Sequence, residues 1–142
     1  MMGHAALPAV GDEVPSFRVD DISADKIKIM ALILRDPNPI HFDTDAVRAA
    51  GLGDRYVNQG GVTMAYVINL LTRWTGSRSS VRSIACRFNS NVFAGDSVEL
   101  GGTVIGVQSV GDETLVECEI WARRADDVGA VVAIGGTAVV AW

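Results

Sequence analysis

The stretch QGGVTMAYVINLLTRW, from Gln59 to Trp74, decides the fold class. From Gly61 onward it would be apolar on nearly every side of a helix, which is typical of a helix buried within a domain. Its polar residues fall on one face near its end, at spacings of three and four residues: Asn69, Thr72 and Arg73. The sequence therefore predicts a long central helix, roughly 20 Å in length at about 1.5 Å per residue.

Strand-like segments follow this helix to the end of the sequence. Four of them are separated by turn residues: 81–93, 98–107, 116–120 and 130–142. In the third, apolar residues alternate with Glu117 and Glu119, which predicts a half-buried strand with one solvent-exposed face. The fourth is apolar on both faces, which favours a central strand or one buried in an interface. A long buried helix among antiparallel strands predicts an α+β layer arrangement.

Shorter elements precede the central helix. We expect an opening strand over 12–22, an amphipathic helix over 24–35 and a second, short helix that closes at Gly51. Ser23 is the predicted N-cap of the first helix, and Pro37 ends it. Asp43 or Thr44 can cap the second, and we assign Asp43 to capping rather than to catalysis.

The segment RDPNPIHFD, from Arg35 to Asp43, joins these two helices. It places Asp36 and His41 five positions apart with two prolines between them. Each proline fixes its own φ and pushes the preceding residue out of the helical region, so the segment loses little entropy on folding. Asp36 and His41 are therefore a candidate acid/base pair on a stiff support. From the residues alone the alternative is a simple turn between helices, with His41 packed or solvated.

The pattern Asp-x-Asn-Pro-Ile-His resembles the signature of the MaoC-like dehydratases, the hydratase 2 family of (R)-specific enoyl-CoA hydratases. The resemblance covers most of the sequence: the preceding helix, the motif and the glycine-started helix come in the family's order, and residues 87–96 resemble its later strand-and-turn segment. It implies one hotdog domain over residues 1–142, in which a curved antiparallel sheet wraps a long central helix, with residues 1–10 as a flexible tail. It also implies a homodimer or a larger homo-oligomer with active sites at the protomer interface.

The resemblance assigns roles to four residues. Asp36 and His41 match the catalytic dyad, and Asn38 matches the asparagine that orders the loop. Gly60 matches the glycine whose backbone N–H binds the thioester carbonyl. Gly61 leaves a second bare N–H at the start of the same helix, so Asn38, Gly60 and Gly61 are expected on the substrate-binding side of the site; the alternative is that the two glycines only allow close packing.

Three departures from the family pattern surround this dyad. Leu34 and Arg35 stand where a small residue and a glycine are usual, and Gln59-Gly60-Gly61 stands where His-Gly-Met is frequent. The serine that some members carry one or two turns into the long helix is not evident near Ile68 and Asn69. The reaction type is therefore better constrained than the acyl group.

The implied reaction is hydration of a trans-2-enoyl thioester, or the reverse dehydration of a (3R)-hydroxyacyl thioester. The dyad can hold the attacking water and move its protons, and a backbone N–H can stabilise the enolate that forms between the proton transfers. This chemistry needs neither a metal nor a redox cofactor; coenzyme A or an acyl carrier enters only as part of the substrate. The acyl chain, the physiological direction and the roles of base and acid within the dyad stay open.

Four arginines lie in a stretch without Asp or Glu: Arg73, Arg78, Arg82 and Arg87. Such a cluster in an acidic protein is a candidate contact for the phosphates of coenzyme A or of an acyl carrier, and we single out Arg78 and Arg82. The alternative is a strand edge kept charged to prevent edge pairing.

Composition excludes several other classes. The formal net charge of −5 argues against nucleic acid as a partner, and no apolar run reaches the roughly 20 residues of a membrane span. The start of the sequence lacks the pattern of a signal peptide, so we expect a cytoplasmic protein in which Cys86 and Cys118 are free thiols. No zinc-ligand spacing is present. Two rivals remain, a hotdog acyl-CoA thioesterase and a non-catalytic or half-site subunit that needs a second hotdog chain.

Overall fold

The structure is a computed structural model that describes residues 6–125 and 132–142. Its helices are α1 (Ala24–Leu34), α2 (Thr44–Ala49) and α3 (Gly60–Thr75), with two short 3-10 turns, η1 (Pro39–His41) and η2 (Arg78–Ser80). Its strands are β1 (Glu13–Val19), β2 (Val81–Phe88), β3 (Val98–Val110), β4 (Glu113–Arg124) and β5 (Ile134–Ala141).

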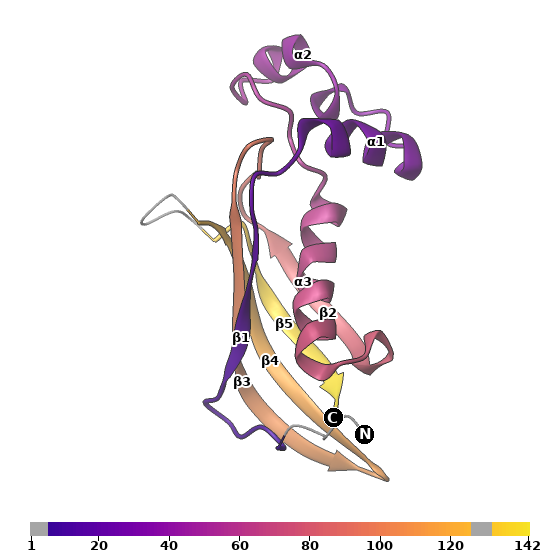
Figure 1. Ribbon diagram of the computed structural model, residues 1–142, viewed down its shortest axis with the longest axis vertical. Coiled ribbons are helices and arrows are strands. Elements are labelled where there is room, and N and C mark those ends of the chain that lie inside the picture. The colour runs from indigo at the N-terminus through magenta and orange to yellow at the C-terminus, as the bar shows by residue number, and fades with distance from the viewer. Residues whose placement is uncertain (1–5, 126–131) are drawn as a thin grey trace.

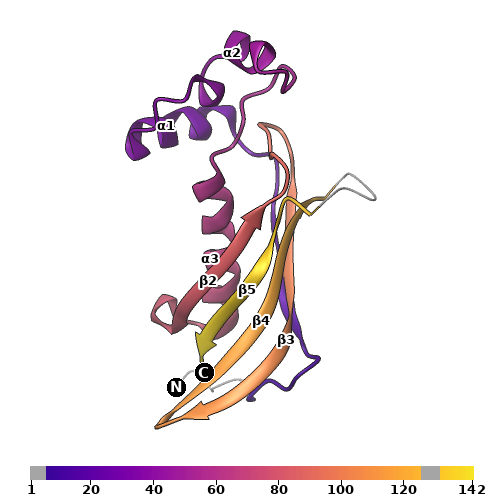
Figure 2. The same cartoon turned by 180° about the vertical axis from the view of Figure 1, so that it is seen from behind.

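The strands form a single curved sheet in the described part of the chain. Its order is β1-β3-β4-β5-β2, and every neighbouring pair is antiparallel. β5 lies between β4 and β2. It belongs to the predicted strand segment 130–142, which is apolar on both faces, and its internal position in the sheet agrees with that prediction. Figure 1 and Figure 2 show the sheet bending around α3, which lies along its concave face. This is the predicted α+β arrangement of a curved sheet on a long central helix.

The core lies between α3 and the concave face of the sheet. Val67, Leu70 and Leu71 of α3 are almost fully buried there. The inward residues of β4, Val116, Cys118, Ile120 and Ala122, alternate with exposed Glu117, Glu119 and Arg123. Full burial of one Val or Leu side chain contributes about 1.5–3 kcal/mol, so this alternation fixes which face of each strand meets the helix.

The two cysteines are free thiols, as predicted. Cys118 is buried in this core and Cys86 is half-buried on β2. Burial, together with the charge of Glu117, raises the pKa of the Cys118 thiol to about 11, so this thiol stays neutral at pH 7.

Beyond the sheet, α1, η1 and α2 gather near the N-terminal end of α3 (Figure 1). The predicted caps are confirmed: the Ser23 side chain accepts from Lys26 N at the start of α1, and Asp43 accepts from Asp45 N and Ala46 N at the start of α2. Both helices are thereby begun by local hydrogen bonds, which places the linking segment between two defined ends.

The structure differs from the sequence-based expectations at two places. Residues 6–10 do not form a free tail: Pro8 is buried, and Ala9 N donates to Asp12 Oδ2 at 2.8 Å. Residues 1–5 lie outside the described part. The strand expected over 81–93 ends at Phe88, because the chain then turns and Phe93 instead forms an isolated bridge with Val57.

Candidate active site

The segment between α1 and α2 is shaped by two consecutive side-chain turns. Asp36 Oδ1 accepts from Asn38 N at 3.0 Å, and Asn38 Oδ1 accepts from Ile40 N at 3.3 Å. The two prolines lie inside these turns and hold Asp36 and Asn38 away from helical geometry. Asn38 therefore orders the loop through its own side chain, the role that the resemblance implies.

His41 is held from behind by the strand-like residue Val57. His41 Nδ1 lies 2.6 Å from the Val57 carbonyl oxygen, and Val57 N donates to the Ile40 carbonyl at 3.0 Å. A carbonyl oxygen can only accept, so Nδ1 carries a proton and the tautomer of the ring is fixed. The His41 side chain is only 7% exposed, so this bond also fixes the orientation of the ring.

Asp36 and His41 face each other across the loop. His41 Nε2 lies 3.2 Å from Asp36 Oδ2, and the Asp36 side chain is 32% exposed. Because Nδ1 already carries a proton, a neutral His41 directs the lone pair of Nε2 toward a carboxylate oxygen. Two acceptors this close are stabilised by a shared proton or by a molecule that donates to both. The pair is thus arranged to hold a two-proton donor such as water.

The exposed side of Asp36 opens on a groove of about 520 Å³. One wall is formed by Lys28, Ala31 and Leu32 of α1 together with its C-cap Arg35, and the other by Pro37 and Phe42. The groove opens the Asp36 side of the pair to solvent. Its middle is apolar and its cations lie on the α1 wall.

α3 begins close to the dyad. Gly60 follows Val57, which holds His41, by three positions, and three positions span about 10 Å at most. Gln59 is the N-cap of α3 but its side chain does not cap the helix, and both glycines are exposed. The N–H groups of Gly60 and Gly61 therefore point out of the helix at the positive end of its dipole.

Phe88 of β2 covers one side of Gly60. A Cβ added to Gly60 would lie 3.1 Å from Phe88 Cε1, whereas one added to Gly61 would meet nothing within 4 Å. Strand pairing brings Phe88 here from a position 28 residues later in the chain, so the sequence alone did not signal this contact.

Sequence reasoning also missed a buried polar cluster behind the start of α3. Asn58 Nδ2 donates to Thr63 Oγ1 at 2.9 Å, and Gln59 Nε2 donates to the Ile27 carbonyl at 2.9 Å. Burial raises the pKa of Tyr66, and a hydrogen bond with the Asn58 side chain opposes that rise. The cluster ties α3 to α1. Its one available signal was the polar pair Asn58-Gln59 directly before the apolar helix.

Arg78 and Arg82, the predicted phosphate contacts, lie at the other end of α3. They follow Thr75, roughly 20 Å along the helix axis from Gly60 at about 1.5 Å per residue. Arg82 forms an ion pair with Glu113 and donates to the Ser79 carbonyl. Within one chain the structure does not bring these arginines to the dyad.

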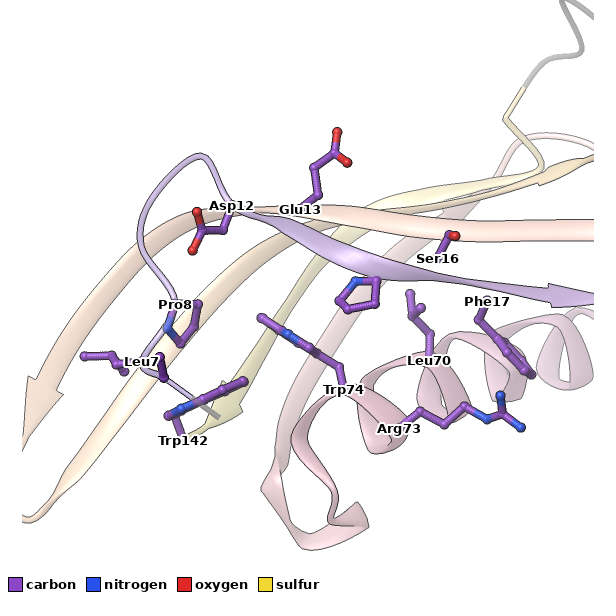
Figure 3. Close-up of a pocket in the computed structure, with 12 residues that line it drawn as sticks. Leu7, Pro8, Asp12, Glu13, Ser16, Phe17, Leu70, Arg73, Trp74 and Trp142 are labelled. Atoms are coloured by element: carbon purple, nitrogen blue, oxygen red, sulfur yellow. The ribbon is translucent and has the colours of Figure 1, made fainter. Parts of the chain in front are cut away.

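A cavity of about 560 Å³ also lies away from the dyad. It sits between β1 and the C-terminal half of α3, and Figure 3 shows Leu70, Arg73 and Trp74 on its helix side. Arg73 stacks over the Phe17 ring at 4.5 Å, and the Trp74 and Trp142 rings are 5.1 Å apart. These groups pack against each other and do not converge on a reacting atom.

The described residues, 6–125 and 132–142, hold no group of three or more His, Cys, Asp or Glu side chains placed to bind a metal ion. None of their helices is long and apolar enough to cross a membrane.

The sequence profile of the MaoC like domain matches residues 7–122. The chain belongs to this MaoC-like family. The match covers the helix before the motif, the dyad, α3 and the strands through most of β4, so it includes every candidate site residue described above.

Solved structures of MaoC-like proteins share the fold of this MaoC-like domain. The (R)-hydratase from A. caviae involved in PHA biosynthesis is 20% identical, with a TM-score of 0.79 over 96% of this chain and 98% of that one. A MaoC-like dehydratase from Rhodospirillum rubrum is 24% identical, with a TM-score of 0.78 over 94% and 92%. The ChsH1-ChsH2 complex from Mycobacterium tuberculosis contains a chain that is 22% identical, with a TM-score of 0.77 over 95% and 98%. The fold is therefore the hotdog fold. No curated protein sequence matches the chain.

Proposed function

We propose that this MaoC-like protein is an (R)-specific enoyl-CoA hydratase, or in the reverse direction a 3-hydroxyacyl-thioester dehydratase, that uses Asp36 and His41 as its acid/base pair. The observation that carries the proposal is the 3.2 Å contact between His41 Nε2 and Asp36 Oδ2, with the His41 ring locked by Val57. Membership of a family of hydratases and dehydratases supports it.

In the proposed mechanism one water binds between the two groups and donates one hydrogen to each. Its oxygen then presents a lone pair to C3 of the trans-2-enoyl group. As the C3–O bond forms, the C2=C3 electrons move toward the thioester carbonyl and the water gives one proton to the pair. The pair returns a proton to C2, which yields the 3-hydroxyacyl thioester with all atoms and charges balanced. Positioned acid/base groups of this kind contribute about 10²–10⁴-fold in rate.

The start of α3 supplies the second element of the proposed mechanism. Negative charge develops on the thioester oxygen between the two proton transfers. The N–H of Gly60 is exposed at the positive end of α3, where a donor stabilises such an oxyanion. Gly61 adds a second N–H one position later.

The assembly we propose is a dimer or larger oligomer, with itself or with a second hotdog chain. The outer face of α1 exposes apolar side chains beside the groove: Ile29 is 52%, Leu32 80% and Ile33 66% exposed. Exposed apolar clusters of this kind mark protein interfaces. The structural similarity to a chain of the ChsH1-ChsH2 complex keeps the heteromeric form open. Sizing of the protein alone and after co-expression with a second hotdog chain separates the two assemblies.

The test of function is the loss of enoyl-thioester absorbance when purified protein meets crotonyl-CoA and longer trans-2-enoyl-CoA thioesters. We expect absorbance to fall without release of free thiol, and chiral analysis to identify the (3R)-hydroxyacyl product. Release of thiol at the same rate as the absorbance change would instead identify the thioesterase. If every chain length is inert, with and without a second hotdog chain, the proposed hydratase is wrong.

A further inference from the structure

α1 ends on an arginine in a backbone conformation that favours glycine. Arg35 has φ 52° and ψ 40°, whereas the corresponding left-handed position at the end of α3 is Gly76, with φ 76°. Among the described residues the other non-glycine with positive φ is Asp21, a residue type whose short carboxylate tolerates this region. Arginine has no such compensation. A strained arginine directly before a candidate catalytic carboxylate points to a role for its side chain.

Arg35 shares the groove with Asp36. Its companions on the α1 wall, Lys28, Ala31 and Leu32, recur at helical spacing and therefore form one stripe. Lys28 lies roughly 10 Å from Arg35 along the helix, at about 1.5 Å per residue. Along this stripe Lys28 lies at one end, Ala31 and Leu32 lie in the middle, and Arg35 lies next to Asp36 at the other end.

These two cations have no acidic partner among the described residues. The Lys28 ammonium lies over the Tyr56 ring at 4.9 Å, and the Arg35 guanidinium has no ion pair or side-chain hydrogen bond within the same part of the chain. Four other arginines are neutralised: Arg48 pairs with Asp45, Arg55 with Asp96, Arg82 with Glu113 and Arg123 with Glu99. Arg73, Arg78 and Arg87 form no ion pair with a described residue either, but they do not line the groove beside Asp36. In a protein with a net charge of −5, two cations without acidic partners beside the dyad attract an anion.

We propose that Arg35, with Lys28, binds a phosphate of the carrier that delivers the enoyl thioester. This inference rests on the proposed function. Coenzyme A and acyl carriers share a pantetheine arm that is uncharged between the thioester and its phosphate, which suits the apolar middle of the groove. The planar guanidinium matches a phosphate through two parallel hydrogen bonds. This assignment replaces Arg78 and Arg82 as the phosphate contacts of this chain.

The test compares one enoyl group on three carriers that differ in phosphate: pantetheine, 4′-phosphopantetheine and coenzyme A. The variant is Arg35→Gly, because glycine fits the left-handed position without strain. We expect KM to rise about tenfold for both phosphorylated thioesters, with kcat retained and the pantetheine thioester unaffected. A rise with coenzyme A alone would assign the contact to its nucleotide phosphates. An equal rise with all three carriers would overturn the proposal.

Three controls keep the result interpretable. Arg35→Lys retains the charge but not the two parallel hydrogen bonds, so it should recover only part of the lost affinity. Arg48→Gln removes an arginine charge from α2 and should leave KM unchanged. Sizing should show the same assembly for Arg35→Gly as for the wild type; dissociation would assign Arg35 to an interface and overturn the proposal.

Calorimetric titration with free coenzyme A separates this inference from the proposed hydratase. It needs no turnover, so it reads the phosphate contact even if the enoyl thioesters are not hydrated. We expect about tenfold weaker binding to Arg35→Gly than to the wild type. The variant should first be shown to unfold at the same or a higher denaturant concentration than the wild type. Equal binding of coenzyme A by the two proteins would then contradict the proposal.

Discussion

Two cavities of the domain differ in kind: one is lined by the C-terminal half of α3, the other by α1 and the segment that carries Asp36, and only the second has an acid/base pair beside it. At the C-terminal half of α3 a cavity of about 560 Å³ is lined by Leu70, Trp74 and Trp142. The two tryptophan rings pack on each other. Near the N-terminal end of α3 a groove of about 520 Å³ opens on Asp36, with His41 behind it and the Gly60 N–H nearby. The volumes are similar, so volume does not locate the site. The candidate site is located instead by polar groups that converge with a fixed orientation.

The difference comes from how each end is built. Two side-chain turns and the Val57 carbonyl fix the orientation of Asp36 and His41 through hydrogen bonds within the chain. The other end is held by apolar and cation–π contacts, which stabilise the fold but supply no proton donor or acceptor at a defined distance. Changes at the first end should therefore alter rate, and changes at the second should alter stability.

The largest effect is expected from His41→Ala. Removing the imidazole eliminates one member of the pair, so kcat should fall about 10²–10⁴-fold. The Val57 carbonyl also loses its partner, which should cost about 1–3 kcal/mol of unfolding free energy. Steady-state kinetics and urea denaturation measure the two effects separately. Wild-type kcat in this variant would remove the imidazole from the mechanism.

A smaller loss is expected from Gly60→Ala. The new methyl group would lie 3.1 Å from Phe88 Cε1, and since Phe88 is 54% exposed its ring can swing aside toward the N–H donor. We expect kcat/KM to fall about tenfold through obstruction of the oxyanion position. Adding Phe88→Leu should recover part of the loss. If the double variant is no better than Gly60→Ala alone, ring displacement is not the cause.

Asn38 tests the loop itself. Asn38→Ala removes the oxygen that accepts from Ile40 N, so we expect a loss of about 1 kcal/mol in stability and a kcat reduced several-fold. Asn38→Asp keeps that acceptor and should stay near the wild type in stability. Matching losses in both variants would show that the turn hydrogen bond is not what positions the dyad.

The smallest effect on activity is expected at the other end of α3. Trp142→Leu removes the ring contact with Trp74, which should lower the free energy of unfolding by about 1 kcal/mol. Well below its melting temperature the variant should keep the wild-type kcat and KM. A large fall in kcat would mean that the cavity in Figure 3 takes part in catalysis, and the contrast between the two ends would fail.

Local patterns in the sequence predicted most of the fold and the core of the site. The apolar run after Gly61 predicted α3, which begins one residue earlier, at Gly60. The spacing of Asp36 and His41 around two prolines predicted a stiff acid/base pair, and the structure brings these groups to 3.2 Å. These features depend on backbone restrictions within a few residues, which a sequence shows directly.

The partners of the site could not be predicted in the same way. The Val57 carbonyl contacts His41, the Phe88 ring lies against Gly60, and Lys28 lines the groove beside Asp36, all through tertiary packing or strand pairing. Arg78 and Arg82 were singled out by charge alone, and a cluster of charges in the sequence does not show that α3 carries them to its far end. The left-handed backbone conformation of Arg35 was not predicted either. Its one signal in the sequence is that Arg35 stands where the family usually has a glycine.

The most direct test of the account is the rate of enoyl-thioester hydration by Asp36→Asn beside the wild type. Asparagine keeps the oxygen that accepts from Asn38 N, so the loop and the stability should be retained. It removes the carboxylate charge and the proton acceptor that faces His41. The account predicts a folded protein whose kcat is lower by about 10²–10⁴-fold. A folded variant that hydrates the thioester at the wild-type rate would contradict it.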